Sequence, residues 1–124
     1  MTGSHTPRHR LWDILDAIRL IRIAVSGLDL SAYKANPEKR AAVERWILTI
    51  SEASRHLPAD LKATQPGIPW DDIAEAGNFL RHVYDQVWPE RTWSLIEDDL
   101  EPLRIAVVTM YEMVREPKDP NPPS

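Results

Sequence analysis

The sequence contains no cysteine, only four glycines, one phenylalanine and no long apolar run. Without cysteine, the chain can form no disulfide framework, no thiolate metal site and no cysteine nucleophile. No segment approaches the roughly 18 apolar residues of a membrane-spanning helix. The first ten residues also lack the apolar segment of a signal peptide. We therefore expect a cytoplasmic protein whose 124 residues form one domain with its own core.

Charges of both signs are present, but they are unevenly distributed. Residues 1–62 hold 10 Lys and Arg against 7 Asp and Glu, whereas residues 63–124 hold 5 against 12. This distribution argues against a broad basic surface for duplex nucleic acid. A small basic site that holds a single phosphate is still compatible with it.

Eleven prolines divide the chain into segments of helical periodicity. Apolar residues recur at three- and four-residue spacing, and no segment alternates with a period of two for long enough to suggest a strand. The helical patterns run from Leu11 to Val25, Val43 to Leu57, Ile73 to Tyr84 and Trp93 to Val114. Pro102 lies inside the last pattern, where we expect a kink or a break.

These patterns predict an all-α fold, an up-and-down four-helix bundle over residues 8–115. Residues 1–7 are expected to be a flexible N-terminus, and residues 116–124 a Pro-rich disordered tail. Residues 28–36 form a connector with at most one helical turn. The second and fourth predicted helices are apolar over more than one stripe, although a small bundle needs only one per helix. This surplus favours a homodimer, but a neighbouring helix of the same chain could cover it instead.

The third predicted helix carries the most informative polar residues. Asn78, Arg81 and His82 are three or four residues apart and can meet on one face. A histidine can move a proton near neutral pH, and an arginine can hold a phosphate through two parallel hydrogen bonds. The face therefore suits phosphoryl chemistry, with the asparagine orienting either partner. On spacing alone, a simpler interpretation is commoner, in which such residues only bond the last carbonyls of their helix.

The segment from Gly77 to Tyr84 resembles the R-N-x-L-x-H-x-Y segment of HepT-like proteins, which belong to the HEPN superfamily. Ile68-Pro69-Trp70 resembles the I-P-W entry to that family's motif helix. Residues 93–103 resemble the W-x-x-x-x-x-D-L-x-x-L opening of its last helix. Residues 11–18, 42–45 and 50–55 resemble its first two helices, so that the resemblance covers about residues 8–115.

The resemblance implies an all-α homodimer that acts as a metal-independent ribonuclease, with RNA as its substrate and no cofactor. In that interpretation His82 is the base, Arg81 stabilises the charge on phosphorus and Asn78 orients the reacting groups. It also implies a toxin of a type VII-like toxin–antitoxin system. The partner would be a minimal nucleotidyltransferase antitoxin, which neutralises the toxin by adenylylation of Tyr84. For Tyr84 and His82 to face one cleft, the helix must end or distort near Val83.

One departure from the family pattern bears on activity. The family's ribonuclease signature places an arginine ahead of the histidine with four to six residues between them, and the corresponding positions here are Gly77, Ala76 and Glu75. The nearest upstream arginine, Arg55, lies on another predicted helix. One hypothesis is that Arg81 brings its guanidinium into the space of the missing arginine. The alternative is a catalytically altered or inactive module that dimerises and docks a nucleotidyltransferase or a nucleotide.

Two further residues are candidates for a supporting role. Arg45 and Glu52 are seven residues apart, so they share a face of the second predicted helix. They could pair with each other or reach the motif helix, although a solvated face is as common an explanation. The acidic residues between Glu97 and Glu101 point in different directions on a helix, and the remaining histidines lack ligand spacing. We predict no metal site.

Overall fold

The computed structural model describes residues 6–82 and 88–123, and gives only the backbone of residues 78–82 and 88. Over these ranges the regular structure is entirely helical, which confirms the all-α prediction. The helices are α1 (Pro7–Val25), α2 (Leu30–Lys34), α3 (Pro37–Arg55), α4 (Ala59–Lys62), α5 (Trp70–His82), α6 (Trp88–Asp98) and α7 (Leu100–Val114). No helix in the described part is both long and apolar enough to cross a bilayer.

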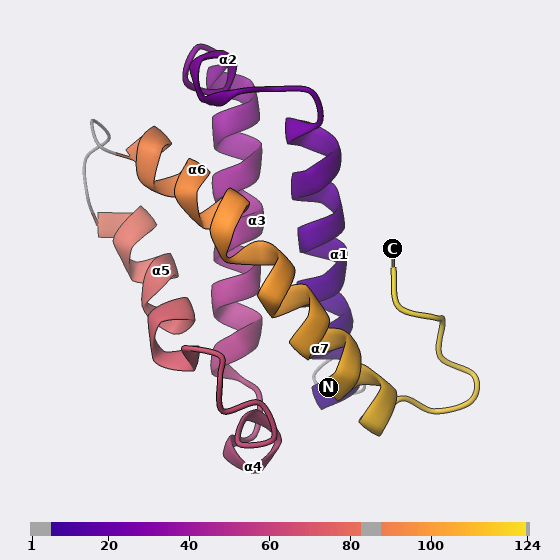
Figure 1. The fold of residues 1–124 in the computed structure, drawn as a ribbon. Coiled ribbons are helices and arrows are strands. Elements are labelled where there is room, and N and C mark those ends of the chain that lie inside the picture. The colour runs from indigo at the N-terminus through magenta and orange to yellow at the C-terminus, as the bar shows by residue number, and fades with distance from the viewer. Residues whose placement is uncertain (1–5, 83–87, 124) are drawn as a thin grey trace.

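Helix α3 stands between α1 and α5, and α7 packs across α1 (Figure 1). The apolar stripes of α1, α3 and α7 meet in one core, as the sequence periodicity predicts. Its fully or almost fully buried members include Leu11, Ile14, Ile18, Ile21, Val43, Ile47, Ile50, Leu103, Val107 and Met110. The core thus fixes α3, and α5 packs on the side of α3 away from α1.

Local sequence sets the helix boundaries. Gly27 adopts a positive φ of 80° just after α1, a conformation that glycine adopts without steric cost. Asp29 caps α2 by accepting a hydrogen bond from the Ala32 N–H at 2.8 Å. Asn36 caps α3 in the same way, and Pro37 occupies its first turn. The connector therefore contains one short helix, as expected.

The last predicted helix is broken into two. Helix α6 ends at Asp98 and α7 begins at Leu100, so that Asp99 interrupts the helix three residues before Pro102. A proline at this position has no N–H for the Asp98 carbonyl, and its ring crowds that carbonyl. The expected break is confirmed, and together with the short helices α2 and α4 it explains why the four-helix pattern yields seven helical segments in the described part.

The C-terminal segment, residues 116–123, contains no helix but makes specific contacts. The Tyr111 hydroxyl donates a hydrogen bond to the Pro120 carbonyl at 2.8 Å. Arg8 on α1 forms an ion pair with Asp119 at 2.9 Å. The predicted disorder of residues 116–124 stays a prediction, but the described part of this tail is tied to both α1 and α7.

The sequence suggests that the surplus apolar residues of the second and fourth predicted helices are covered either by a second subunit or by a neighbouring helix of the same chain. The structure differs between the two helices. On α3, Ala53 is buried within the chain and Trp46 packs partly against the core. On α7, Ile105 and Met113 remain 55% and 56% exposed, and Ile23 on α1 is similarly open. Intrachain packing therefore covers the extra stripe of α3, whereas α7 keeps large apolar side chains at the surface.

Candidate functional site

Helix α5 carries the predicted motif. It begins after Pro69, with Asp71 and Asp72 in its first turn, where carboxylates interact favourably with the helix dipole. The Trp70 indole N–H lies 3.2 Å from each of the carbonyls of Lys62 and Gln65, which anchors the start of the helix to the preceding loop. The other end of α5 is His82.

The predicted catalytic residues all fall near that end. The structure describes the backbone of Asn78, Arg81 and His82 as helical, and their side chains lie outside what it describes. Tyr84 lies outside the described residues altogether. The meeting of these side chains in one cleft therefore stays a prediction.

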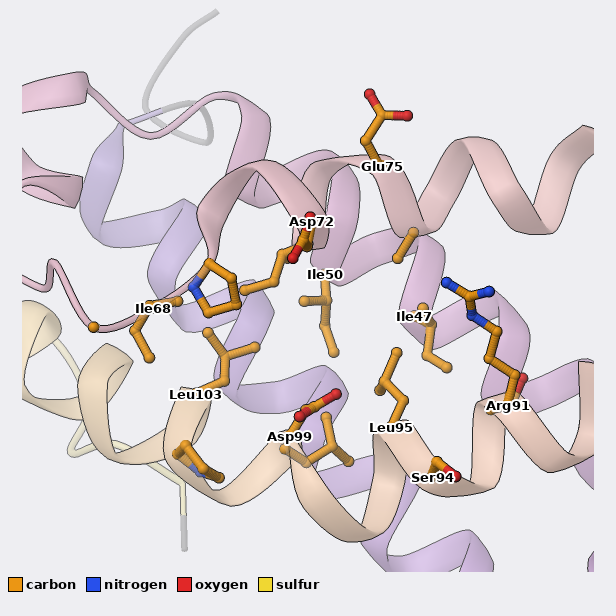
Figure 2. A pocket seen from close by; sticks show the side chains of 17 residues that line it. Ile47, Ile50, Ile68, Asp72, Glu75, Arg91, Ser94, Leu95, Asp99 and Leu103 are labelled. Carbon is orange, nitrogen blue, oxygen red and sulfur yellow. The ribbon is translucent and has the colours of Figure 1, made fainter.

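A groove of about 980 Å³ separates α5 from α6 and α7 (Figure 2). Apolar residues of several helices line it, among them Ile47, Ile50, Ile68, Leu95 and Leu103.

Its polar lining is mainly acidic, with Asp72, Glu75 and Asp99 against Arg91. Burial, with a smaller contribution from neighbouring Asp98, raises the pKa of Asp99. Asp72 and Asp99 outnumber the one guanidinium and disfavour a phosphate chain, while the Glu75 side chain points away from the groove (Figure 2). The groove thus suits an apolar surface better than an RNA backbone.

The other side of α5 packs against α3. Gly77 is buried there, and its N–H donates a hydrogen bond to the Ser51 hydroxyl at 3.1 Å. A Cβ added at position 77 would lie 2.6 Å from Ser51 Oγ, closer than real Cβ atoms come to a neighbour, and 3.0 Å from Ser51 Cβ. Only glycine therefore fits at position 77 while Ser51 keeps its place.

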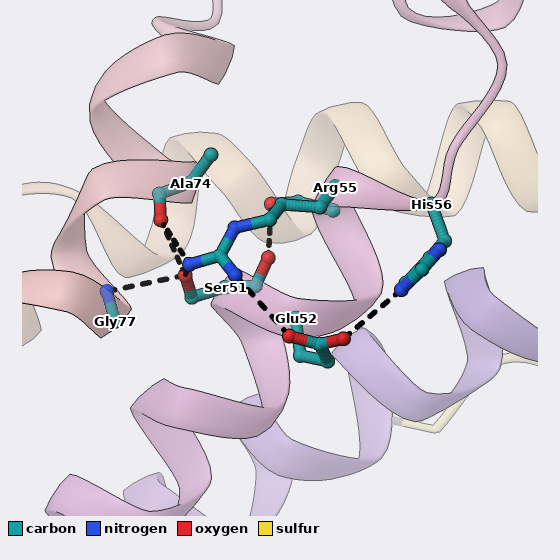
Figure 3. Close-up of polar contacts among 7 residues, drawn as sticks. Ser51, Glu52, Arg55, His56, Ala74 and Gly77 are labelled. Atoms are coloured by element: carbon teal, nitrogen blue, oxygen red, sulfur yellow. Dashed lines mark hydrogen bonds and ion pairs between the residues drawn. The ribbon is translucent and has the colours of Figure 1, made fainter. Parts of the chain in front are cut away.

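Ser51 and Arg55 fasten α3 to α5 at this point (Figure 3). The buried Ser51 hydroxyl donates to the Ala74 carbonyl at 2.8 Å. Arg55 Nη2 donates to the same carbonyl at 2.8 Å and lies 3.4 Å from Ser51 Oγ. The same nitrogen is 3.3 Å from the point where a side chain at position 77 would start. A guanidinium therefore lies beside the backbone position that lacks the signature arginine.

Glu52 extends this cluster along α3. One carboxylate oxygen accepts from Arg55 Nη1 at 3.3 Å, and the other lies 2.9 Å from His56 Nε2. Arg45, the other residue predicted to share this face, lies about two helical turns earlier and is exposed. The structure thus brings Glu52 next to Arg55, a residue to which the sequence assigned no role.

Comparison with known proteins identifies the family. The chain matches the family model described as ribonuclease HepT-like over residues 14–110. The chain belongs to the HepT-like family. The match begins within α1 and ends within α7, so it includes every helix that surrounds α5.

Related proteins agree with this assignment. The chain is 31% identical over 104 residues to "Probable ribonuclease HepT" of Thermococcus cleftensis, covering 84% of this chain and 93% of that one. A protein of Methanocaldococcus jannaschii, provisionally named an RNase, is 27% identical over 94 residues, 76% of this chain and 86% of its own. Another from Caldanaerobacter subterraneus, also provisionally named an RNase, is 28% identical over 79% of this chain and 88% of its own. No solved structure matches this chain significantly.

For this HepT-like chain, the structure also bears on metal binding. Among the side chains that the structure describes, those of residues 6–77 and 89–123, no group of three or more His, Asp or Glu lies close enough together to hold a metal ion. The acidic residues at the end of α6 are exposed, as expected for a solvated face.

Proposed function

We propose that this HepT-like protein is a metal-independent ribonuclease whose reacting groups lie at the end of α5. The match to the ribonuclease HepT-like model carries the proposal, since it spans the whole of that helix. Within its last two turns, α5 holds an imidazole at His82, a fixed cation at Arg81 and an amide at Asn78. These groups supply proton transfer, charge stabilisation and orientation for phosphoryl chemistry.

In the proposed reaction, His82 takes the proton of a ribose 2′-hydroxyl, and that oxygen attacks the adjacent phosphorus. Arg81 stabilises the negative charge of the phosphorane, while Asn78 orients the phosphate or the imidazole. The bond between phosphorus and the 5′-oxygen then breaks, and the leaving oxygen takes a proton from the imidazolium or from water. The products are a 2′,3′-cyclic phosphate and a free 5′-hydroxyl.

The biological setting of this proposal is a toxin–antitoxin pair. The likeness of the segment ending in Tyr84 to the family motif supports a nucleotidyltransferase antitoxin as the partner. The partner would transfer the adenylyl group of ATP to the Tyr84 oxygen, with loss of the phenol proton and release of pyrophosphate. The new phosphodiester is negatively charged and lies two residues from His82, where it would repel RNA.

A homodimer is part of the same proposal. The exposed Ile105 and Met113 on α7 and the apolar groove beside α5 support the homodimer. Apolar surface of this kind is costly to leave in water and commonly marks a protein–protein interface. The active sites of the two subunits would then share one interface.

Cleavage of RNA in EDTA tests the ribonuclease proposal. The purified wild type should release fragments that end in a 2′,3′-cyclic phosphate, and His82→Ala should lose this activity. His9→Ala is a matched control, because His9 lies in the first turn of α1 and bonds Thr6. Equal cleavage by wild type and His82→Ala would overturn the assignment.

The second candidate is a binding module with altered or no catalysis. Gly77 favours it, because the signature arginine is missing from α5. Expression without the partner distinguishes the two candidates. A ribonuclease toxin should arrest growth in a manner relieved by His82→Ala, whereas a binding module should not arrest growth at all.

A further inference from the structure

We propose that Arg55, on α3, supplies the phosphate-binding guanidinium that the ribonuclease signature places at position 77 of α5. This inference rests on the proposed ribonuclease function and deepens it, since it names a further residue that contacts RNA. In this proposal the cation comes from α3 instead of α5, but its guanidinium still lies beside α5.

The first argument is the space beside position 77. Arg55 Nη2 lies 3.3 Å from the position of a Cβ at residue 77, and Ser51 Oγ lies 2.6 Å from it. A side chain at position 77 would therefore clash with Ser51 Oγ and crowd the Arg55 guanidinium. The absence of a side chain at Gly77 leaves room for Arg55 beside α5.

The second argument is that the guanidinium is fixed. Arg55 Nη2 donates to the Ala74 carbonyl at 2.8 Å, and Nη1 to Glu52 at 3.3 Å, so the planar group is held from two directions (Figure 3). A positioned guanidinium loses little further freedom when it binds phosphate. About a third of the Arg55 side chain, 31%, is still exposed, so an anion can reach it.

The third argument concerns Glu52, the anion that Arg55 already contacts. The second oxygen of Glu52 lies 2.9 Å from His56 Nε2. If a phosphate takes the place of Glu52 on Arg55, the carboxylate keeps His56 as a partner. Both side chains of the Glu52–Arg55 pair are partly exposed, and such pairs are weak.

The fourth argument is location along α5. Position 77 precedes His82 by five residues, which is about 7.5 Å along a helix axis. A cation at that point lies on the same helix segment as the proposed base, as the signature spacing requires. In the proposal, the Arg55 guanidinium holds a phosphate of the strand on which His82 acts, at about this distance along α5.

The competing explanation is that Arg55 only fastens α3 to α5. Arg55→Gln separates the two, because glutamine keeps an N–H donor on a long side chain but carries no charge. Arg55→Lys is the second variant and keeps the charge. Arg19→Gln is the matched control, since Arg19 is a half-exposed, ion-paired arginine on α1. Thermal unfolding of each variant reports whether the fold is retained.

The measurement is the affinity for a 2′-O-methyl RNA oligomer, which cannot be cleaved, over a range of KCl concentrations. Arg55→Gln should bind at least about tenfold more weakly, and its plot of log affinity against log salt should be shallower by about 0.7, the value for one phosphate contact on a single strand. Arg55→Lys should retain the wild-type slope. With cleavable RNA, Arg55→Gln should lower kcat by about 100-fold or more, as expected for a lost contact to developing charge.

A relocation variant adds a gain of function. Ser51→Gly combined with Gly77→Arg makes room for an arginine on α5, and this pair in the Arg55→Ala background should recover cleavage relative to Arg55→Ala alone. The proposal is wrong if Arg55→Gln binds and cleaves as Arg19→Gln does, or if its salt slope is unchanged. If the wild type binds RNA without cleaving it, the ribonuclease proposal fails. The salt dependence of RNA affinity in Arg55→Gln then still tests whether Arg55 contacts a phosphate. If the wild type neither binds nor cleaves RNA, both proposals fail.

Discussion

The Ser51 hydroxyl occupies the space that any side chain at position 77 would need. Its oxygen accepts the Gly77 N–H at 3.1 Å and would lie 2.6 Å from a Cβ placed on that residue. A small residue on α5 and a small polar residue on α3 thus permit a direct contact between the α5 backbone and α3. The contact also brings Arg55 to the motif helix.

This relationship predicts a strong coupling between positions 77 and 51. Gly77→Ala alone should destabilise the protein by about 1–2 kcal/mol, because overpacking outweighs the gain of about 1 kcal/mol in helix propensity. In a Ser51→Gly background, the same substitution should stabilise the protein by up to about 1 kcal/mol. Urea unfolding of the four proteins gives the coupling energy. If Gly77→Ala has the same effect in both backgrounds, the close contact does not exist in solution.

The helices were predictable from the sequence because their signals are local. Apolar spacing marks each helix, and Pro37 and Pro102 act on their own segments through a fixed φ and a missing N–H. The placement of Arg55 was not predictable in this way. It depends on Gly77, 22 residues later, and on the packing of α3 against α5, which no local pattern encodes. The only sequence signal is a glycine within a predicted helix, at a position where the family carries arginine.

Tyr33 gives a prediction about alkaline pH. Its ring is fully buried beside Trp93, at 5.3 Å between ring centroids, and in the described part of the chain its hydroxyl has no hydrogen-bond partner. Burial, and secondarily the negative charge of Glu44, raises the pKa of Tyr33 above its ordinary value near 10. The folded state therefore favours the neutral phenol.

The sign of the pH effect follows from this shift. The contribution of Tyr33 to stability is fully present below the unfolded-state pKa and is lost as pH rises above about 10. Tyr33→Phe should show a shallower loss of stability above pH 10, by up to about 1.4 kcal/mol per pH unit. At neutral pH it should be neutral or stabilising, since it removes an unsatisfied buried hydroxyl. Denaturant unfolding from pH 7 to 11 measures both effects, and parallel curves for the two proteins would contradict the prediction.

The tail contact at Tyr111 is testable by proteolysis. Tyr111→Phe removes the hydrogen bond to the Pro120 carbonyl, which should cost about 1 kcal/mol and loosen the tail, although Arg115 still donates to that carbonyl at 3.3 Å. Trypsin should then cleave after Lys118 several-fold faster, as followed by mass spectrometry. Thr109→Val is the control, because the Thr109 hydroxyl bonds the Ile105 carbonyl of its own helix. An unchanged cleavage rate in Tyr111→Phe would mean that this bond does not hold the tail.

The dimer proposal predicts which exposed apolar residue matters. Ile105 on α7 and Ile23 on α1 are exposed to a similar degree, 55% and 60%, but only α7 belongs to the segment with a surplus apolar stripe. Sedimentation velocity should show a wild-type dimer that Ile105→Glu dissociates and Ile23→Glu leaves intact. Dissociation by Ile23→Glu alone would place the interface on α1. If the wild type is a monomer, the dimer proposal is wrong.

Adenylylation predicts a specific mass change at Tyr84. Incubation of the protein with the proposed nucleotidyltransferase partner and ATP should add whole AMP units, and peptide mapping should find them on the peptide that contains Tyr84. Tyr84→Phe should stay unmodified, whereas Tyr33→Phe, which alters a buried tyrosine on α2, should be modified as the wild type is. The modified protein should also bind the 2′-O-methyl RNA oligomer more weakly, because each AMP adds negative charge near His82. If the protein is modified but this peptide carries no AMP, the modified residue is not Tyr84. If Tyr84 is modified and RNA binding is unchanged, the modification does not neutralise the protein by blocking RNA.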